Sequence, residues 1–177
     1  IVLSDVSATV EPDALQRSVA YFSDPRVGFV CPTYALRKPG SPGEAAYWTY
    51  QTRLKADEAA LDSPLGAHGA FYLFRRKHWC ALPPDTINDD FILPMRIVLQ
   101  GLRGVYDPSI VAYEEEMTHH DDEFRRRVRI GAGNMQQAIR LFRLADPRRP
   151  GLAFTFLSGK ALRAVVPFLL VLLLLSN

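Results

Sequence analysis

Short apolar runs alternate with longer amphipathic stretches along most of the chain, and proline or glycine separates many of them. Short apolar runs bounded by turn-forming residues predict strands, and here they fall at 1–3, 27–31, 71–74, 105–106 and 110–113. Apolar positions three or four residues apart predict helices, and these fall at 12–22, 44–61, 75–79, 91–100 and 118–144. Strands that alternate with helices favour an α/β fold. Pro32 is expected to end the second strand, because proline cannot donate to a strand ladder.

The sequence begins inside the first predicted strand. Ile1, Val2 and Leu3 are apolar β-formers, so we expect this strand to be buried. No Met and no signal peptide precede it. We therefore interpret the sequence as an internal or C-terminal part of a longer chain, and expect any site shared with the earlier part to be incomplete here.

An uncharged apolar run, AVVPFLLVLLLLS, occupies residues 164–176. Residues 169–175 are apolar on every face, whereas a helix packed on a core usually keeps a polar stripe. The run is shorter than the roughly 20 residues that cross a bilayer, so it predicts the start of a transmembrane segment, with a buried core helix as the alternative. The positive-inside bias then places the preceding domain in the cytoplasm of a protein integral to the plasma or inner membrane. The basic residues that indicate this orientation are Arg140, Arg143, Arg148, Arg149, Lys160 and Arg163.

Composition narrows the class of protein. Of the 177 residues, 48% are hydrophobic and 23% are charged, which excludes a disordered chain and a wholly membrane-embedded one. The 21 basic and 19 acidic residues give a net charge of +2, so the chain has no overall attraction to nucleic acid. Two cysteines are too few for a disulfide scaffold, and free thiols in a reducing compartment are the simpler interpretation.

Carboxylates occur at two places of chemical interest. Asp5 follows the first strand, and open α/β sheets bind ligands at the carboxyl ends of their strands. A carboxylate there can bind a divalent metal, or it can serve only as a turn or cap. Asn88-Asp89-Asp90 precedes a predicted helix. A helix N-terminus accounts for one acid, whereas two close acids raise the pKa of one of them, as a general base requires.

Two charged segments lie near the start of the helix predicted at 118–144. Residues 123–129, EFRRRVR, suit either a solvated face paired with nearby acids or a phosphate clamp, and low net charge disfavours a nucleic-acid patch. The tract His119-His120-Asp121-Asp122 contains metal-binding residue types, but adjacent helix residues point in different directions. The sequence has no His-Glu-x-x-His, no Cys-x-x-Cys, no phosphate-binding glycine loop and no Gly-x-Ser-x-Gly.

The order of these motifs resembles that of family-2 glycosyltransferases, membrane-bound inverting enzymes related to cellulose and hyaluronan synthases. The resemblance covers essentially the whole chain. Its segments are 4–7, 11–15, 24–28, 66–70 with Arg75 and Arg76, 88–91 with Gly101, 106–108 with Glu114, 125–134, and Lys160, Arg163 and Pro167. It implies a GT-A fold, an α/β fold whose nucleotide-binding half precedes Ile1. It divides the chain into the C-terminal part of the glycosyltransferase domain (1–146), a linker and amphipathic interface helix (147–163) and the start of a transmembrane segment (164–177).

The resemblance also implies catalytic and metal-binding roles. Asp90 matches the general base of an inverting transfer, and Asp89 matches the acid that precedes it. Asp5 and Ser7 occupy the family's Asp-x-Asp motif, which would bind Mn²⁺ or Mg²⁺ together with the donor diphosphate. Ser7 stands where the family has its second Asp, so metal binding is expected to be weaker or to need another residue.

Further residues match the substrate-binding parts of the family. Arg126 and Arg129 fall within the family's Gln-x-x-Arg-Trp motif and would contact the diphosphate. That motif lacks its Gln and its Trp here, since Arg126 and Ile130 replace them, which places processive synthesis in doubt. The turn containing His68, Gly69 and Ala70 would line the pocket for the sugar and the acceptor.

The expected partners follow from this resemblance. They are a nucleotide-sugar donor such as a UDP-sugar, a glycan or lipid acceptor, and membrane lipid, with no nucleic acid. Two alternatives remain open. A catalytically silent, membrane-tethered scaffold with the same fold would tolerate Ser7 in place of Asp. A metal-dependent hydrolase would instead use His119 to Asp122.

Overall fold

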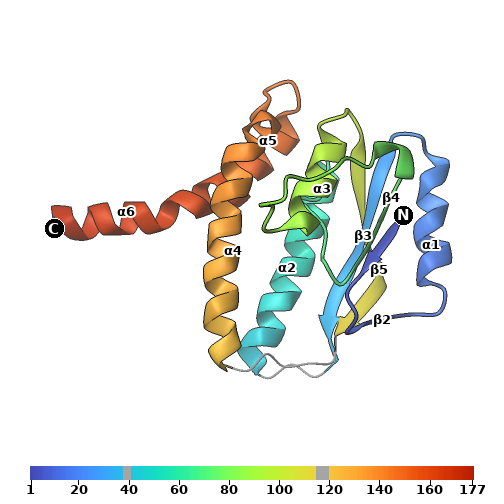
Figure 1. Cartoon of the computed structure of the whole chain (residues 1–177), viewed down its shortest axis with the longest axis horizontal. Helices are drawn as coiled ribbons and strands as arrows, with labels where there is room; N and C mark the ends of the chain where they lie inside the picture. Colours follow the sequence, from blue (N-terminus) through green and yellow to red (C-terminus); the bar gives the residue numbers. More distant parts are fainter. Residues whose placement is uncertain (38–40, 115–119) are drawn as a thin grey trace.

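The computed structural model describes residues 1–37, 41–114 and 120–177, with side chains described in 1–37, 41–114 and 124–177. These residues form a five-stranded sheet with helices on both sides (Figure 1). Its strand order is β1-β4-β3-β5-β2, where β3 and β5 are parallel and the other neighbours antiparallel. The strands are β1 (Val2–Ser4), β2 (Ala8–Val10), β3 (Val27–Leu36), β4 (Phe71–Phe74) and β5 (Arg103–Glu114). The mixed α/β fold predicted from the sequence is confirmed.

The two long central strands correct the predicted boundaries. β3 does not end at Pro32 but continues to Leu36, and the strands predicted at 105–106 and 110–113 are the single strand β5. The pairing of β3 with β5 shifts register between Pro32 and Thr33. Proline has no N–H to donate to a ladder and is tolerated at such an irregularity, so the strand continues beyond it.

β1 is an edge strand, and the prediction that it is buried is wrong. It pairs with β4 on one side only, and Ile1 and Val2 are 46% and 42% exposed. The apolar composition of a strand does not bury it unless other elements cover it. Position in the sheet decides burial here, and position depends on long-range pairing that residues 1–3 do not encode.

Helices pack on both sides of the sheet (Figure 1). α1 (Ala14–Ala20) and the 3₁₀ turn η1 (Tyr21–Ser23) lie on one side, and α2 (Pro42–Leu61) and α3 (Asp89–Val98) lie on the other. The Ser41 side chain caps α2 by accepting a hydrogen bond from the Glu44 N–H at 3.2 Å. α4 (His120–Arg140) ends before the predicted boundary and is followed by the 3₁₀ turn η3 (Phe142–Ala145).

The main core lies between the sheet and the helices α2 and α3, and α5 (Pro150–Phe156) adds to it. Its largest fully buried side chains include Phe29 of β3, Met95 of α3 and Phe156 of α5. Burial of each contributes about 1.5–3 kcal/mol. β5 lies so close to this core that a Cβ on Gly104 would be 2.2 Å from the Phe29 ring, so glycine is required there.

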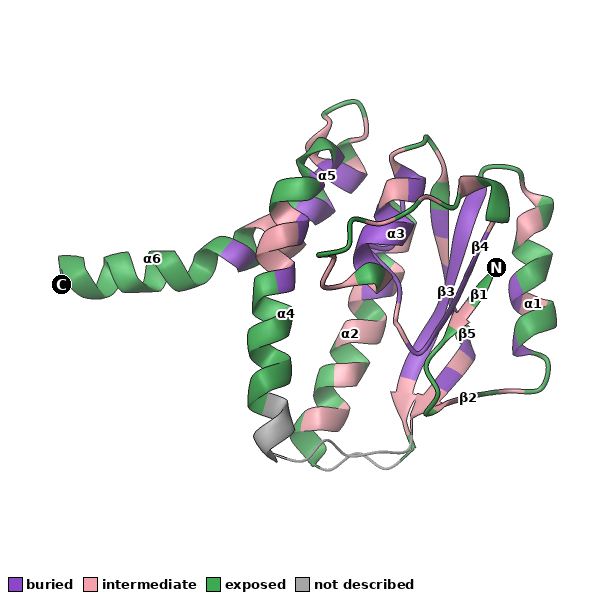
Figure 2. Cartoon of the chain, in the orientation of Figure 1, coloured by how far each residue is buried: buried purple, intermediate pink, exposed green. Residues whose placement is uncertain are grey.

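The C-terminal residues form one long helical segment. α5 continues through the π-helical turn η4 (Leu157–Ala161) into α6 (Leu162–Ser176). In the described part of the chain, Pro150–Ser176 is the one helix long and apolar enough to cross a membrane, and 6% of its most apolar stretch is buried. Figure 2 shows α6 projecting from the domain with exposed residues along its length. The segment predicted as the start of a transmembrane helix is therefore the second half of a candidate span.

Candidate active site

A cleft of about 600 Å³ is lined by α2, α3, α4 and the loop that precedes β4. Of the nine residues to which the sequence resemblance gives catalytic, substrate-binding or metal-binding roles, eight line this cleft, and they come from four separate parts of the chain. They are Asp5, His68, Gly69, Ala70, Asp89, Asp90, Arg126 and Arg129. The fold thus gathers these acids, basic residues and the glycine turn around one space.

The turn at 66–70 joins two of these parts. The Asp5 N–H and the Ser4 hydroxyl both donate hydrogen bonds to the carbonyl of Ala70, at 3.2 and 3.0 Å. The Ala67 N–H donates to the carbonyl of Asp90 at 2.8 Å. Gly69 lies between these anchors in the sequence, and a Cβ placed on it would be 3.6 Å from Asp5 Oδ2 and 3.7 Å from Asp90 Oδ2. The turn therefore holds both carboxylates against one small residue.

The paired acids differ in their surroundings. Asp89 is exposed, whereas Asp90 is half-buried at the start of α3. Burial raises the pKa of Asp90, the charge of Asp89 adds to this effect, and the charges of Lys160 and Lys55 oppose it. A carboxylate with a raised pKa accepts a proton more readily than an ordinary one, so the surroundings of Asp90 suit it to act as a base.

Helix α4 is fitted tightly to the loop that carries these acids. The Ile87 N–H donates to Gln136 Oε1 at 3.1 Å, and Gln136 Nε2 donates to the Asp85 carbonyl at 2.8 Å. A Cβ on Gly133 would lie 2.3 Å from Asn88 Nδ2, so a side chain at this position would displace Asn88. These contacts fix the helix that carries Arg126 relative to the paired acids.

A buried ion pair between Lys55 and Glu58 supports the turn at 66–70, and it was not predicted from the sequence. Lys55 Nζ donates to the carbonyls of Leu65 and Gly66 and lies 3.6 Å from Glu58 Oε2. The same Glu58 oxygen accepts from the Leu65 N–H at 2.8 Å. A lysine and a glutamate three residues apart on one face of α2 were the available signal. Lys55 also lines the cleft, so this network joins the structural support to the site.

The C-terminal helix contributes two basic residues to the cleft, Lys160 and Arg163. The Lys160 ammonium lies 4.5 Å from the centre of the Phe91 ring. Phe91 is the residue that directly follows Asp90 in the sequence. Lys160 belongs to the π-helical turn η4, and π-helical turns inside α-helices occur frequently at functional sites. The candidate membrane helix is therefore in contact with the paired-acid segment.

Aromatic side chains form one wall of the cleft. The rings of Tyr34 and Trp48 are 4.2 Å apart, Tyr47 packs edge-on against Trp48, and the His68 ring lies 5.8 Å from Tyr34. Trp48 packs against the second hydrophobic cluster of the fold, and it also lines the cleft. Burial, with Lys55 and Lys160, lowers the pKa of His68 to about 3, so this imidazole is neutral at pH 7.

Ser7 is placed differently from Asp5. Its side chain is not part of the cleft lining, and its hydroxyl donates to Glu114 Oε1 at 3.0 Å. The other Glu114 oxygen accepts from the Tyr34 hydroxyl, and Glu114 itself lines the cleft. Among the side chains in the described ranges, no group of three or more His, Cys, Asp and Glu could hold a metal ion.

The tract from His119 to Asp122, on which the hydrolase alternative depends, lies outside the residues whose side chains the structure describes.

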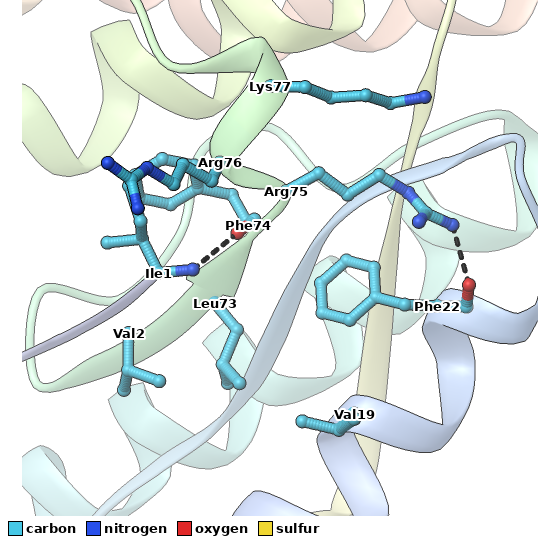
Figure 3. A pocket seen from close by; sticks show the side chains of 9 residues that line it. All are labelled: Ile1, Val2, Val19, Phe22, Leu73, Phe74, Arg75, Arg76 and Lys77. Atoms are coloured by element: carbon cyan, nitrogen blue, oxygen red, sulfur yellow. Dashed lines mark hydrogen bonds between the residues drawn. The ribbon is translucent and has the colours of Figure 1, made fainter.

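A second hollow, of about 360 Å³, lies beside β1, β4 and the end of α1 (Figure 3). Its lining is largely apolar and includes Val2, Val19 and Leu73. Arg75, Arg76 and Lys77 also line it, and the Arg75 guanidinium already donates to the carbonyls of Phe22 and Asp24 at 2.6 and 2.7 Å. This hollow offers no acid–base pair, so the cleft is the candidate active site.

Two comparisons with known proteins found similar proteins. The family model described as "Glycosyl transferase family group 2" matches residues 1–177. Of the solved structures, 31 chains match. One is a mannosyltransferase from Pyrobaculum calidifontis in complex with GDP-Man and Mn²⁺, with a TM-score of 0.68 and 23% identity. That match covers 88% of this chain and 44% of the other chain, so this chain spans less than half of the solved relative.

The comparison with curated proteins found no match. The structural likeness shows a shared fold, because identity is low, and the family model covers every residue of the sequence. The chain has a GT-A-like α/β fold and belongs to glycosyltransferase family 2.

Proposed function

We propose that this chain is the acceptor-side part of a glycosyltransferase that moves a sugar from a nucleotide-sugar to a glycan or lipid. One observation carries the proposal: Asp5 and Asp90 meet at Gly69, in a cleft that Arg126 and Arg129 also line. Sugar transfer from a nucleotide-sugar needs a base for the acceptor and cationic groups for the departing diphosphate. Those groups converge here.

Asp90 is the general base in this proposal. It accepts the proton of an acceptor hydroxyl as that oxygen attacks the anomeric carbon, and the nucleoside diphosphate leaves from the opposite face, which inverts the configuration. Its half-buried position and raised pKa support this role. Asp89, exposed beside it, keeps the local potential negative and so favours protonation of Asp90.

Arg126 and Arg129 bind the diphosphate in this proposal. Both are exposed residues of α4 that line the cleft, and guanidinium groups can bind phosphate oxygens in a two-pronged geometry. The Pyrobaculum enzyme was solved with GDP-Man. That complex supports a nucleotide-diphosphate sugar as the donor class here, with a UDP-sugar as our first expectation.

Divalent metal assistance is part of the proposal, and the Pyrobaculum complex with Mn²⁺ supports it. Mg²⁺-type sites are commonly built from one or two carboxylates, substrate phosphates and water. Asp5 is an exposed carboxylate on the cleft wall and can supply one such ligand, whereas the Ser7 hydroxyl donates to Glu114. A bound metal would neutralise charge that develops on the leaving diphosphate.

The remaining residues suit the sugar. His68, Gly69 and Ala70 line the cleft next to the aromatic wall, and the neutral His68 imidazole can donate or accept a hydrogen bond. We further propose that Pro150–Ser176 continues into the membrane, with 147–163 at its interface and the catalytic domain on the cytoplasmic side. The apolar composition of α6 and the basic residues before it support this arrangement.

The test uses the full-length parent protein in membranes. Release of nucleoside diphosphate is measured from UDP-glucose, UDP-N-acetylglucosamine and GDP-mannose, each with Mn²⁺ and with Mg²⁺. Release from one donor, dependent on a divalent metal, is the expected result. Binding of nucleotide without any release would favour the silent scaffold. Hydrolytic activity lost in a His119→Ala variant and kept in Asp5→Ala would favour the hydrolase.

A further inference from the structure

Two buried oxygen atoms, in side chains that line the cleft, have no hydrogen-bond partner within the described part of the chain. They are the Tyr72 hydroxyl and the Gln137 side-chain oxygen, and neither atom has a partner among the described residues. Tyr72 is 1% exposed and Gln137 is 2% exposed, and both line the cleft. Most buried polar groups in folded proteins are paired, because an unpaired one costs free energy. Two such unpaired groups in one cleft therefore indicate a ligand that pairs with them when it binds.

The two side chains come from different elements but reach the same region. Tyr72 lies on β4, directly after the turn that contains Gly69. Burial, followed by the charges of Asp89 and Asp90, raises the pKa of Tyr72. Gln137 lies one helical turn after Gly133, where an added Cβ would lie 2.3 Å from Asn88 Nδ2, so this face of α4 is the one packed toward the paired-acid segment. Tyr72 is thus close enough to the acids to respond to their charges, and Gln137 lies on the helix face that packs toward them.

The surroundings of the Tyr72 hydroxyl and the Gln137 amide favour a neutral hydroxyl group over a phosphate as their ligand. Leu65 and Phe91 also line this part of the cleft and offer no hydrogen bond from their side chains. The nearby Lys55 ammonium is already used by the carbonyls of Leu65 and Gly66 and by Glu58. An uncharged phenol and an uncharged amide match neutral hydroxyl groups better than phosphate, for which guanidinium or ammonium groups are preferred.

We propose that the Tyr72 hydroxyl and the Gln137 amide bind hydroxyl groups of the sugar that lies next to Asp90, and that they select among sugars. The inference rests on the proposed function, since Asp90 marks where a sugar hydroxyl reacts. A site built to hydrogen-bond a hydroxyl rejects an analogue that lacks it, because its own polar groups are then left unpaired. The sugar belongs either to the donor or to the acceptor, and the test distinguishes the two.

The test uses Tyr72→Phe and Gln137→Met in the full-length protein. Each change removes an unpaired polar group and keeps the approximate side-chain volume. We expect both variants to unfold at the same temperature as the wild type or higher, and kcat/KM to fall by roughly ten-fold or more. A structural role would lower the unfolding temperature and activity together. Tyr50→Phe on the exposed side of α2 and Gln16→Met on α1 are the matched controls, and both should behave as the wild type.

Two further measurements show whether the sugar belongs to the donor or to the acceptor. They also distinguish a failure of this inference from a failure of the proposed function. A rise in KM for the nucleotide-sugar alone assigns the pair to the donor, and a rise in KM for the acceptor alone assigns it to the acceptor. Stabilisation by each nucleotide-sugar is also compared with that by the matching nucleoside diphosphate, which needs no turnover. Unchanged kcat/KM and unchanged stabilisation in both variants would overturn the inference. Retained transfer in Asp90→Asn would instead overturn the base assignment.

Discussion

The carboxylates of Asp5 and Asp90 converge on a single point, since both lie within 4 Å of the position where a Cβ on Gly69 would stand. Hydrogen bonds from Asp5 and Ser4 to Ala70, and from Ala67 to Asp90, hold the turn between them. The two acids come from β1's carboxyl end and from α3's N-terminus. The proposed catalytic base and the proposed metal ligand are thus placed together by one glycine turn.

Gly69→Ala tests this convergence. The added methyl would make ordinary contacts of 3.6 and 3.7 Å with the two carboxylates, so we expect the variant to fold with little loss of stability. The methyl occupies space that the substrate needs, and kcat/KM should fall by about ten-fold. Gly131→Ala on α4 is the control, because within the described structure its added Cβ would meet nothing within 4 Å apart from the adjacent backbone of its own helix. Equal kcat/KM in both variants would show that the turn does not contact substrate.

The pH dependence of transfer should reflect the environment of Asp90. Its pKa is raised, and a base must be ionised to act, so kcat should rise with pH through a value above the ordinary carboxyl pKa of 3.8. Lys160 and Lys55 oppose that shift, whereas Asp89 promotes it. Lys160→Met should therefore move the acid limb of the kcat–pH profile to a pH that is higher by about one unit.

Two variants control this measurement. Lys77→Met removes a charge from the hollow beside β4, which is separate from the cleft that holds the paired acids, and should leave the limb in place. Lys160→Arg keeps a positive charge and should restore most of the wild-type profile. An acid limb that does not respond to Lys160→Met would mean that Lys160 does not act on Asp90.

Asp90 also predicts a pH-dependent difference in stability. Because its folded pKa is raised, its favourable contribution is fully present below 3.8 and is lost as pH rises through the folded value. At pH 7 the buried charge therefore destabilises the fold. Asp90→Asn should unfold at a higher temperature than the wild type at pH 7, and the difference should shrink as pH approaches 3.8. Thermal unfolding at several pH values measures it, and a less stable variant at pH 7 would contradict the assignment.

The buried pair of Lys55 and Glu58 should matter to stability more than a surface pair. Lys55→Met leaves Glu58 without its cation and the carbonyls of Leu65 and Gly66 without a donor, and should cost about 3 kcal/mol of unfolding free energy. Adding Glu58→Gln removes the unpaired charge while keeping an acceptor for the Leu65 N–H, so the double variant should be less destabilised. Denaturant unfolding of both variants checks this, and additive losses would refute the coupling.

Sequence patterns predicted the α/β fold and most helices because those depend on local periodicity. They also gave Asp90 and Asp5 as candidate site residues, since adjacent acids and a post-strand acid are visible in the chain itself, and both residues line the cleft. The edge position of β1 and the continuation of β3 past Pro32 depend on pairing between distant residues. In the sequence, Tyr72 looks like an ordinary core residue and Gln137 like an ordinary helix residue. The tertiary structure is needed to show that their oxygen atoms have no partner among the described residues. The contact of Lys160 with Phe91 likewise requires the tertiary structure.

The central claim is that Asp90 removes the acceptor proton and does not hold the nucleotide. The most direct measurement compares wild type, Asp90→Asn and the exposed control Asp57→Asn in the full-length protein, with nucleoside-diphosphate release and nucleotide-sugar affinity measured side by side. The account predicts that Asp90→Asn loses release by at least about a hundred-fold while its donor affinity stays within about two-fold. Full release by Asp90→Asn, or loss of its donor affinity, would contradict it.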